Sequence, residues 1–333
     1  MSNLRLGFNP YTYARVAVMK SELIRKDEWH SMLKMGFHEV LRTLQDGGYR
    51  EEITGLELQR LQLAALEGAL NRNLMRTFEK LLRISDEKLR KVLEIYLQRY
   101  TVENVKAIIR GKLTGVSNEE VEQLLVPTAM YPREYFIDLM KKEEIAEIMK
   151  KLPFSVLAKE KADLFSIENA LDRAYILQLF DLAQRLRGQG KALRELIQAE
   201  LDIINSKIVL RLKNEGMKKT EIVQYLVAPT KEIEMLAGKE DVKSVIDGLR
   251  KIGLVVCGER IPESEMMAHA EIELDTTLLR KERLLMHQFP LTVNSIIGFM
   301  FAKEIEVKNL KVLVKGKKLG LDEEYLSKLV VVA

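Results

Sequence analysis

Amide and basic side chains recur three times in this chain at the same spacing. Each copy has an Asn, a Lys two residues on, an Arg or Lys at six, a Lys at eight and a Gly at eleven. The copies are Asn104, Lys106, Arg110, Lys112, Gly115; Asn205, Lys207, Arg211, Lys213, Gly216; and Asn309, Lys311, Lys315, Lys317, Gly320. Such a cationic set could bind a ligand, an ion or a nucleic acid, whereas a buried amide could join two helices.

The string is predicted to lie on a helix that ends at its Gly, because glycine readily adopts the left-handed conformation of a helix C-terminus. At about 100° per residue, each Asn shares a face with the apolar residue four positions later. The Lys at two and the cation at six fall on the opposite face. We therefore expect the Asn side chains to be buried and these cations to be exposed. Ser117, Thr220 and Asp322 are predicted to begin a short helix after each Gly.

A second repeated element lies about 33 residues upstream of each Asn, on a predicted long amphipathic helix. It consists of a Glu, a Leu and an Asn or Asp: Glu67, Leu70, Asn71; Glu168, Leu171, Asp172; and Glu271, Leu274, Asp275. A buried amide needs hydrogen-bond partners. We therefore predict a polar pair within each unit: Asn104 with Asn71, Asn205 with Asp172, and Asn309 with Asp275.

A structural role is favoured for these polar residues over a ligand site or a nucleic-acid face. A binding site that is needed once does not require three copies, whereas helix register must be fixed in every unit. No aromatic residues alternate with the cations, as stacking on single-stranded nucleic acid requires. We therefore predict no nucleic acid and no small molecule as partner.

The repeat also sets the domain organisation. Its steps of 101 and 104 residues indicate tandem domains rather than a short-repeat solenoid. Helix formers dominate a chain with 7 Pro and 18 Gly, which predicts an all-α fold of three similar helical domains of about 100 residues. Their expected bounds are 1–128, with an N-terminal segment, 129–230 and 231–333. Leu254 to Cys257 and Leu329 to Val332 could form a short two-stranded ribbon.

The composition limits which cellular compartments and which classes of binding partner are plausible for this chain. The net charge of +4, from 53 basic and 49 acidic residues, is too small to indicate nucleic-acid binding. The single cysteine, Cys257, excludes an internal disulfide and fits a reducing compartment. The longest apolar run, near Ile296 to Ala302, is shorter than the ~20 residues of a membrane-spanning helix. We expect a protein that is soluble or peripheral to a membrane, on the cytoplasmic side.

Patterns for catalysis and metal binding are weak. Residues 188–191, Gly-Gln-Gly-Lys, resemble part of a phosphate-binding loop but lack its full spacing and its preceding strand. No two histidines have the spacing of a zinc or di-iron site; they are His30, His38, His269 and His287. We predict no catalytic residues, no cofactor, no metal and no enzymatic activity.

Two strings resemble a known family. They are residues 11–20, Tyr-Thr-Tyr-Ala-Arg-Val-Ala-Val-Met-Lys, and the segment from Arg99 to Lys112. Both resemble strings in the C subunits of the archaeal and bacterial A/V-type ATP synthases, the counterparts of the d subunits of the V-type ATPases. The resemblance covers essentially the whole chain, including the threefold repeat. Ala17 and Thr101 depart from it, since the family usually has Arg and Asp there.

The resemblance implies three helical domains about a pseudo-threefold axis, which form a funnel. It implies a non-catalytic central-stalk subunit, seated on the membrane rotor ring and holding the central stalk, that transmits torque for ion-coupled ATP synthesis or hydrolysis. Its implied place is peripheral, at the cytoplasmic face of the cell membrane. The alternative is a helical-repeat adaptor that binds another protein or RNA. Tyr11, Tyr13, Arg15 and Lys20 lie outside the repeated part and are our candidate interface, or a strap across the units.

Overall fold

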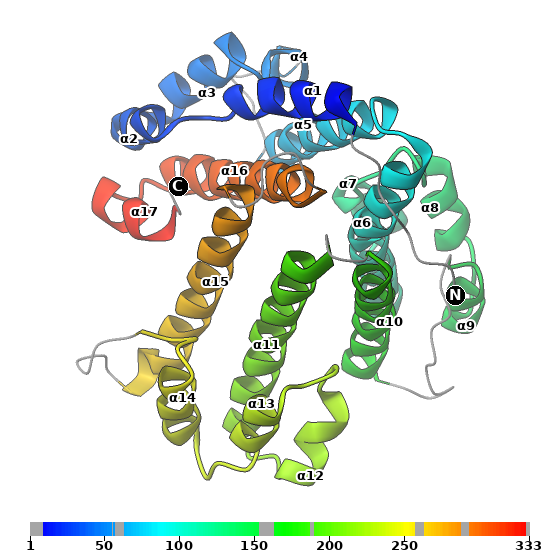
Figure 1. Ribbon diagram of the computed structural model, residues 1–333, viewed down its shortest axis with the longest axis vertical. Helices are drawn as coiled ribbons and strands as arrows, with labels where there is room; N and C mark the ends of the chain where they lie inside the picture. The colour runs from blue at the N-terminus through cyan, green and yellow to red at the C-terminus, as the bar shows by residue number, and fades with distance from the viewer. Residues whose placement is uncertain are drawn as a thin grey trace.

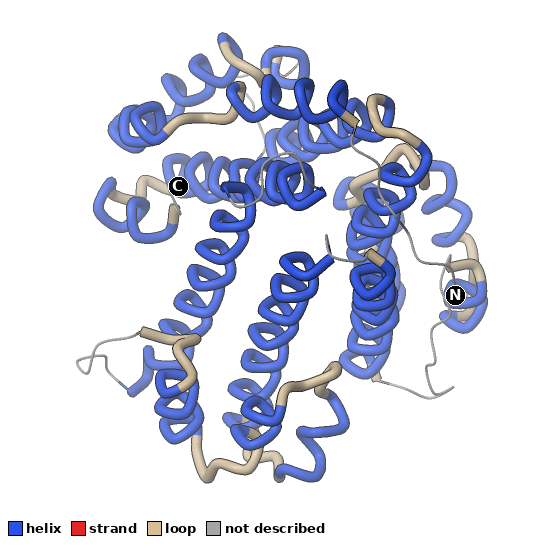
Figure 2. Tube along the Cα trace, in the orientation of Figure 1, coloured by secondary structure: helices blue, strands red, loops and turns tan. Residues whose placement is uncertain are grey.

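The computed structural model describes residues 9–54, 56, 63–152, 163–186, 190–256, 263–287 and 293–330. Every regular element in these residues is a helix (Figure 2). The all-α prediction is therefore confirmed for the described part of the chain. Leu254–Val256 and Leu329–Val330 form no strand, and Cys257, Val331 and Val332 of the suggested ribbon lie outside the described residues.

Three pairs of long helices frame the molecule (Figure 1). The pairs are α5 (Leu63–Arg83) with α6 (Glu87–Thr114), α10 (Leu164–Arg185) with α11 (Gly190–Asn214), and α15 (Glu263–His287) with α16 (Val293–Lys318). The first helix of each pair carries the Glu, Leu, Asn or Asp element, and the second carries the Asn string. Both repeated motifs therefore lie on long helices, as the apolar spacing predicts.

Short helices precede and follow each pair. Those that precede are α1 (Pro10–Ser21), α2 (Lys26–Lys34), α3 (Phe37–Asp46) and α4 (Arg50–Ile53); α8 (Arg133–Met140) and α9 (Ile145–Lys150); and α13 (Lys231–Leu236) and α14 (Val242–Lys251). Those that follow are α7 (Asn118–Leu124); α12 (Lys219–Ile222) with the 3₁₀ turn η2 (Val223–Tyr225); and α17 (Glu323–Leu329). The same succession of short, long, long and short helices thus occurs three times.

The long helices contact one another in a closed cycle. The two helices of each pair pack together, and between pairs α6 packs on α10, α11 on α15, and α16 on α5. In Figure 1, α15, α11 and α10 run side by side down the molecule, while α16 and α5 cross above them. The cycle returns the C-terminal pair of helices to the N-terminal pair.

The apolar side chains of these helices form two buried clusters. The larger one draws on α1 through the N-terminal half of α11, together with α16 and α17. The smaller one draws on the C-terminal half of α11 and on α12 through α15. Each cluster contains residues from more than one predicted unit, so burial of apolar surface, at about 25 cal/mol per Å², holds the units to one another.

Glycine ends the second long helix of each pair, as predicted. Gly115, Gly216 and Gly320 have φ of 73°, 79° and 73°, in the left-handed region that glycine adopts without strain. The next residue in each case donates its N–H to a carbonyl five positions back, for example Val116 to Gly111 over 3.0 Å. This bond satisfies a carbonyl that the helix end would otherwise leave free.

The predicted starts of the short helices are confirmed in two units out of three. The side chains of Ser117 and Asp322 accept backbone N–H groups of α7 and α17. Thr220 does not begin its helix, because α12 starts at Lys219 after an extended Lys218. A hydroxyl at the right distance from Gly is therefore not sufficient, since the local turn decides which residue takes the extended conformation of the N-cap.

Candidate functional site

The repeated asparagines are buried, as the helical projection predicts, with exposures of 2%, 0% and 4% for Asn104, Asn205 and Asn309. Asn104 Nδ2 donates to Val126 O over 2.9 Å, and Asn104 Oδ1 accepts from Val126 N over 2.8 Å. Asn205 forms the same two bonds with Val227, both of 2.8 Å. Asn104 and Asn205 therefore each fasten the backbone that follows the short helix of their own unit.

The predicted polar pairs within each unit are wrong. Asn71, Asp172 and Asp275 do not bind the asparagines but the lysine two positions after the Asn of the preceding unit. The contacts are Lys106 Nζ with Asp172 Oδ1 at 2.5 Å, Lys207 Nζ with Asp275 Oδ1 at 2.8 Å, and Lys311 Nζ with Asn71 Oδ1 at 2.6 Å. The first unit contacts the second, the second contacts the third, and the third contacts the first.

The basic residue six positions after the repeated Asn adds a second ion pair to two of these three contacts between units. Arg110 forms two hydrogen bonds to the carboxylate of Glu168, and Arg211 forms two to Glu271, at 2.7 and 2.9 Å. Paired N–H groups on a carboxylate fix orientation as well as distance. The third unit has Lys315 here, which is exposed and forms no ion pair among the described residues. The contact that closes the cycle therefore has fewer charged groups than the other two.

The expectation that the Lys at position two is exposed is also wrong. Lys106 is buried, and Lys207 and Lys311 are half-buried. A projection of one helix identifies the face opposite the Asn, but in the folded chain the first long helix of the next unit covers that face. The lysines bury their methylene groups in this contact and keep the ammonium against a polar partner.

The electrostatic surroundings of these lysines differ between contacts. Burial alone lowers the pKa of Lys106, but the carboxylates of Asp172 and Glu103 shift it upward overall. Burial raises the pKa of Asp172, and Lys106 offsets part of that effect. Lys311 faces a neutral amide, so burial lowers the pKa of its ammonium, with only Glu67 opposing.

A second set of equivalent positions brings all three units together. Arg99, Glu200 and Glu304 each lie five residues before the repeated Asn, on α6, α11 and α16. Arg99 Nη2 lies 3.3 Å from Glu200 Oε1, and Arg99 Nη1 lies 3.1 Å from Glu304 Oε2. Their side chains are 19%, 21% and 16% exposed. We call these three residues the central triad.

Tyrosines surround the central triad. The hydroxyls of Tyr96 and Tyr100 donate to Glu304 over 2.7 and 2.6 Å, and Arg99 Nε donates to the hydroxyl of Tyr175 over 3.2 Å. The guanidinium carbon of Arg99 lies 4.2 Å from the centre of the Tyr96 ring, within cation–π range. Burial raises the pKa of Tyr96 and Tyr100, which keeps both as neutral donors. The sequence pattern did not reveal the triad, because the three repeats have different residue types at this position. A search of the aligned repeats for positions with opposite charges would find it.

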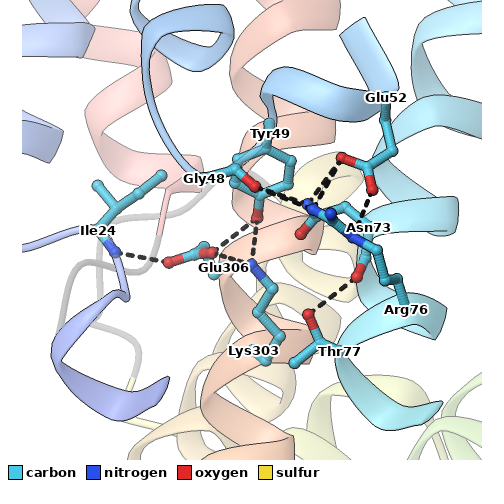
Figure 3. Close-up of polar contacts among 9 residues, drawn as sticks. All are labelled: Ile24, Gly48, Tyr49, Glu52, Asn73, Arg76, Thr77, Lys303 and Glu306. Atoms are coloured by element: carbon cyan, nitrogen blue, oxygen red, sulfur yellow. Dashed lines mark hydrogen bonds and ion pairs between the residues drawn. The ribbon is translucent and has the colours of Figure 1, made fainter. Parts of the chain in front are cut away.

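Another buried network joins the N-terminal segment to α16 (Figure 3). Glu306 accepts from the Tyr49 hydroxyl over 2.7 Å and from the backbone N–H of Ile24 over 2.6 Å. Lys303 Nζ donates to Glu306 over 2.7 Å and to the Tyr49 hydroxyl over 3.0 Å. Burial, together with the charge of Glu306, raises the pKa of Tyr49 well above its ordinary value. The segment before α5 is thus anchored to the third unit.

The predicted interface residues on α1 divide between two faces. Tyr13 is buried, whereas Tyr11 is 61% exposed, Arg15 is exposed and Lys20 is half-buried. The helix α1 itself packs on α16. The hydroxyl of Thr12 donates to the backbone carbonyl of Ile84, between α5 and α6, over 2.6 Å. The helix α1 therefore contacts both the first and the third unit, as a strap would.

In the described part of the chain, no group of three or more His, Cys, Asp or Glu side chains is placed to hold a metal ion. Of the loop-like segment 188–191, Gly188 and Gln189 lie outside the described residues, and Gly190 and Lys191 begin α11. Cys257 also lies outside them.

Comparison with known proteins gives matches over nearly the whole chain. A family model described as ATP synthase (C/AC39) subunit matches residues 12–329, which run from α1 to α17. The C subunit of the A-type ATP synthase of Methanococcoides burtonii is 30% identical over 95% of this chain and 92% of its own. That of Archaeoglobus fulgidus is 30% identical over 97% and 96%. That of Haloferax volcanii is 29% identical over 96% of both chains.

Proposed function

Because the chain belongs to the ATP synthase (C/AC39) subunit family, we propose that it is the socket that couples a membrane rotor ring to the central stalk. Membership makes it a non-catalytic stalk subunit of a rotary ATPase, related to the C subunits of A-type ATP synthases. Its task is therefore mechanical. The observation that carries the proposal is the closed cycle of contacts among the three repeated units.

We further propose that the units are three domains about a pseudo-threefold axis, bounded near 1–128, 129–230 and 231–333. Two sets of equivalent positions support this arrangement. The lysines at position two each reach the following unit, and the last reaches the first. The central triad supplies one side chain from each unit to a single point, which on this proposal lies close to the axis. A funnel with its axis through the triad would follow.

A torque-bearing socket must resist shear between its parts. Contacts that run in one rotational sense around a closed cycle share a load, because no unit has a free edge. The polar side chains of the cycle add directional bonds to a close-packed apolar core, which deforms little. These properties suit a part that turns with two partners at once and passes force between them.

The exposed face of α1 is the proposed contact with a partner subunit. Tyr11, Arg15 and Val18 share that face and are exposed, and Arg15 has no ion pair among the described residues. Tyr13 lies on the opposite face of α1 and is buried. Of the predicted interface residues, Tyr11 and Arg15 are therefore the best placed to meet the rotor ring or the stalk.

The proposed location is the cytoplasmic face of the cell membrane, with the chain held there by its partners. None of the described helices has the length and apolarity needed to cross a bilayer. On this proposal, attachment depends on contacts with the proteolipid ring, and polar contacts of this kind weaken as salt screens them.

Reconstitution from purified parts tests the proposal. The full chain is mixed with detergent-solubilised rotor ring, with and without central-stalk subunits, and complexes are separated by size. We expect the chain to migrate with the ring, to recruit the stalk subunits to it, and to leave the ring progressively as salt is raised. The Arg15→Glu variant should bind more weakly, while Lys251→Glu, at an exposed position of α14, serves as a matched control for the change in charge.

Failure of the folded chain to bind either the ring or the stalk subunits would refute the proposed role. Retention on the ring across a broad salt titration would refute the polar character of the contact. Equal losses for the two variants would show that net charge, rather than the α1 face, governs binding.

A further inference from the structure

A cavity of about 940 Å³ lies between the N-terminal helices and α5. Its walls are the corner between α1 and α2, the turn after α3, and one polar face of α5, with Phe299 and Lys303 of α16 also lining it. This volume is in the range of pockets that hold a small molecule. We propose that the cavity binds a phosphate ester that carries a free hydroxyl group.

The polar face of α5 is continuous along the cavity. Asn73, Arg76, Thr77, Lys80 and Arg83 follow one another at spacings of three, one, three and three, which keeps them on one side of the helix. Asn73 is only 2% exposed, Lys80 is half-buried and Arg83 is exposed. The stripe thus runs from a buried amide to two cations at the opening.

The buried end of this stripe has an acceptor without a donor. Asn73 Nδ2 donates to Gly48 O and to Glu52 Oε2, both over 2.9 Å, and these two bonds fix which way the amide faces (Figure 3). Asn73 Oδ1 is buried and has no hydrogen-bond partner among the described residues. A buried carbonyl oxygen without a donor is unfavourable. A ligand hydroxyl in the cavity would supply that donor.

The open end has cations without counterions. The side chains of Lys80 and Arg83 form no hydrogen bond or ion pair among the described residues, whereas Arg76 is paired with Glu51 and Glu52. The lining contains Arg25, Arg76, Lys80, Arg83 and Lys303 against Glu22, Glu28 and Glu79. Two free cations three residues apart on a helix suit a phosphate group, which an Arg can bind through two N–H groups.

The threefold repeat does not account for these residues. The positions of the second unit that correspond to Asn73, Arg76 and Lys80 are Ala174, Leu177 and Asp181, as the alignment of Glu67 with Glu168 shows. If the stripe served only to hold α5 in its unit, the second unit would need a similar set. In the third unit, aligned by Glu271, the corresponding positions are Thr277, Arg280 and Leu284, so only the arginine recurs and the complete stripe occurs in the first unit alone.

The ligand group has two possible sources, a soluble phosphate ester or the glycerophosphate headgroup of an anionic lipid. Apolar side chains at the cavity, including Met19, Leu23, Met32 and Phe299, offer a surface for the hydrocarbon part of either. The probes are therefore glycerol 3-phosphate, followed by calorimetry, and vesicles of phosphatidylglycerol or phosphatidylcholine, followed by co-sedimentation.

The decisive experiment uses the full chain. It first compares two ligands on the wild-type protein and then compares variants with one ligand. We expect glycerol 3-phosphate to bind at least fivefold more tightly than n-propyl phosphate, which lacks the hydroxyls that Asn73 Oδ1 would accept from. The double variant Lys80→Ala, Arg83→Ala should lose at least tenfold in affinity for glycerol 3-phosphate. The control Lys88→Ala, Lys91→Ala removes the same charge from exposed positions of α6 and should bind as the wild type does.

Binding of phosphatidylglycerol vesicles that the first double variant loses and the control keeps would assign the site to a lipid headgroup. Binding of the soluble ester alone would assign it to a free metabolite. The proposal is overturned if folded wild-type protein binds neither probe, if the two double variants bind equally well, or if n-propyl phosphate binds as tightly as glycerol 3-phosphate. Circular dichroism of each variant verifies that it is folded.

Discussion

Lys311 of α16 donates to Asn71 of α5 over 2.6 Å, at the position where the other two units pair a lysine with an aspartate. The contact that closes the cycle is therefore the one in which a half-buried ammonium lacks a direct counterion. The N-terminal segment compensates by packing α1 and α3 on α16, and by bonding Tyr49 and Ile24 to Glu306. Two contacts between units are therefore held by a lysine–aspartate ion pair, and the third by a lysine–asparagine hydrogen bond together with the packing of the N-terminal segment.

Replacing Asn71 with Asp should stabilise the protein, because it gives Lys311 the counterion that the other contacts have. We expect a gain of about 1 kcal/mol in the free energy of unfolding at neutral pH, the upper part of the range for partly exposed pairs. Urea denaturation measures it. The converse variant, Asp275→Asn, should lose a similar amount at its own contact, and a neutral or destabilising Asn71→Asp would contradict the comparison.

Replacing Arg99 with Leu should destabilise the protein by about 2–4 kcal/mol, because it leaves Glu200 and Glu304 without their shared cation in a largely buried site. Exchanging the charges, with Arg99→Glu and Glu304→Arg together, should recover part of the loss, since the two positions are equivalent in the repeat. Thermal and urea unfolding of the single and double variants provide the test. A single variant as stable as the wild type would mean that the triad contributes nothing.

Replacing Asn205 with Leu should cost about 2–4 kcal/mol, since it leaves both the N–H and the carbonyl of buried Val227 without partners. The free energy of unfolding measures the loss. The pKa of Asp172 should not change in this variant, because Asp172 binds Lys106 and not Asn205. Lys106→Met is the matched variant that should change it. Titration of Asp172 by NMR separates the two, and a shift in Asn205→Leu would count against the assigned contacts.

Replacing Thr101 with Val should be neutral or stabilise by up to about 1 kcal/mol. The Thr101 hydroxyl is fully buried and has no hydrogen-bond partner among the described residues, so the substitution removes an unsatisfied polar group with little change of shape. The midpoint of urea denaturation checks this. Thr12→Val is the control, since Thr12 is equally buried but bonded to a carbonyl, and it should destabilise.

Asp202 makes stability depend on pH in mildly acidic solution. Burial raises its pKa above the ordinary 3.8, with hydrogen bonds from Gln198 and Thr230 opposing. Between 3.8 and the raised value the folded state binds more protons than the unfolded state, so this contribution to stability falls as pH rises through that range. Asp202→Asn should remove that component. The difference in unfolding free energy between variant and wild type, measured from about pH 3 to 7, should change in the variant's favour as pH increases, and a flat difference would contradict the shift.

Local rules predicted much of the fold, because they depend on short segments. The glycine caps at Gly115, Gly216 and Gly320 follow from one residue in the left-handed conformation, and the burial of Asn104 follows from helix periodicity. Helix periodicity did not predict the hydrogen-bond partner of Asn104. Val126 is 22 residues further on, and its position depends on how the chain turns after α7.

The contacts between units could not be predicted from one helix at a time. Lys106 is buried only because α10 covers its face, and a helical projection contains no information on neighbouring helices. The central triad was missed for another reason. Arg99, Glu200 and Glu304 are complementary rather than alike, and a search for repeated residues discards positions at which the copies differ.

The closed cycle has a consequence for behaviour in dilute solution. When each unit contacts the next in a single rotational sense, the units form either a closed ring or an open filament. Separate copies of such a unit would assemble only at concentrations above their dissociation constant. Here one covalent chain holds the three units, so closure is intramolecular and does not reverse on dilution. With Lys311 returned to Asn71, the corresponding contact surface of the first unit is already occupied, which leaves it unavailable for adding a fourth unit and growing a filament.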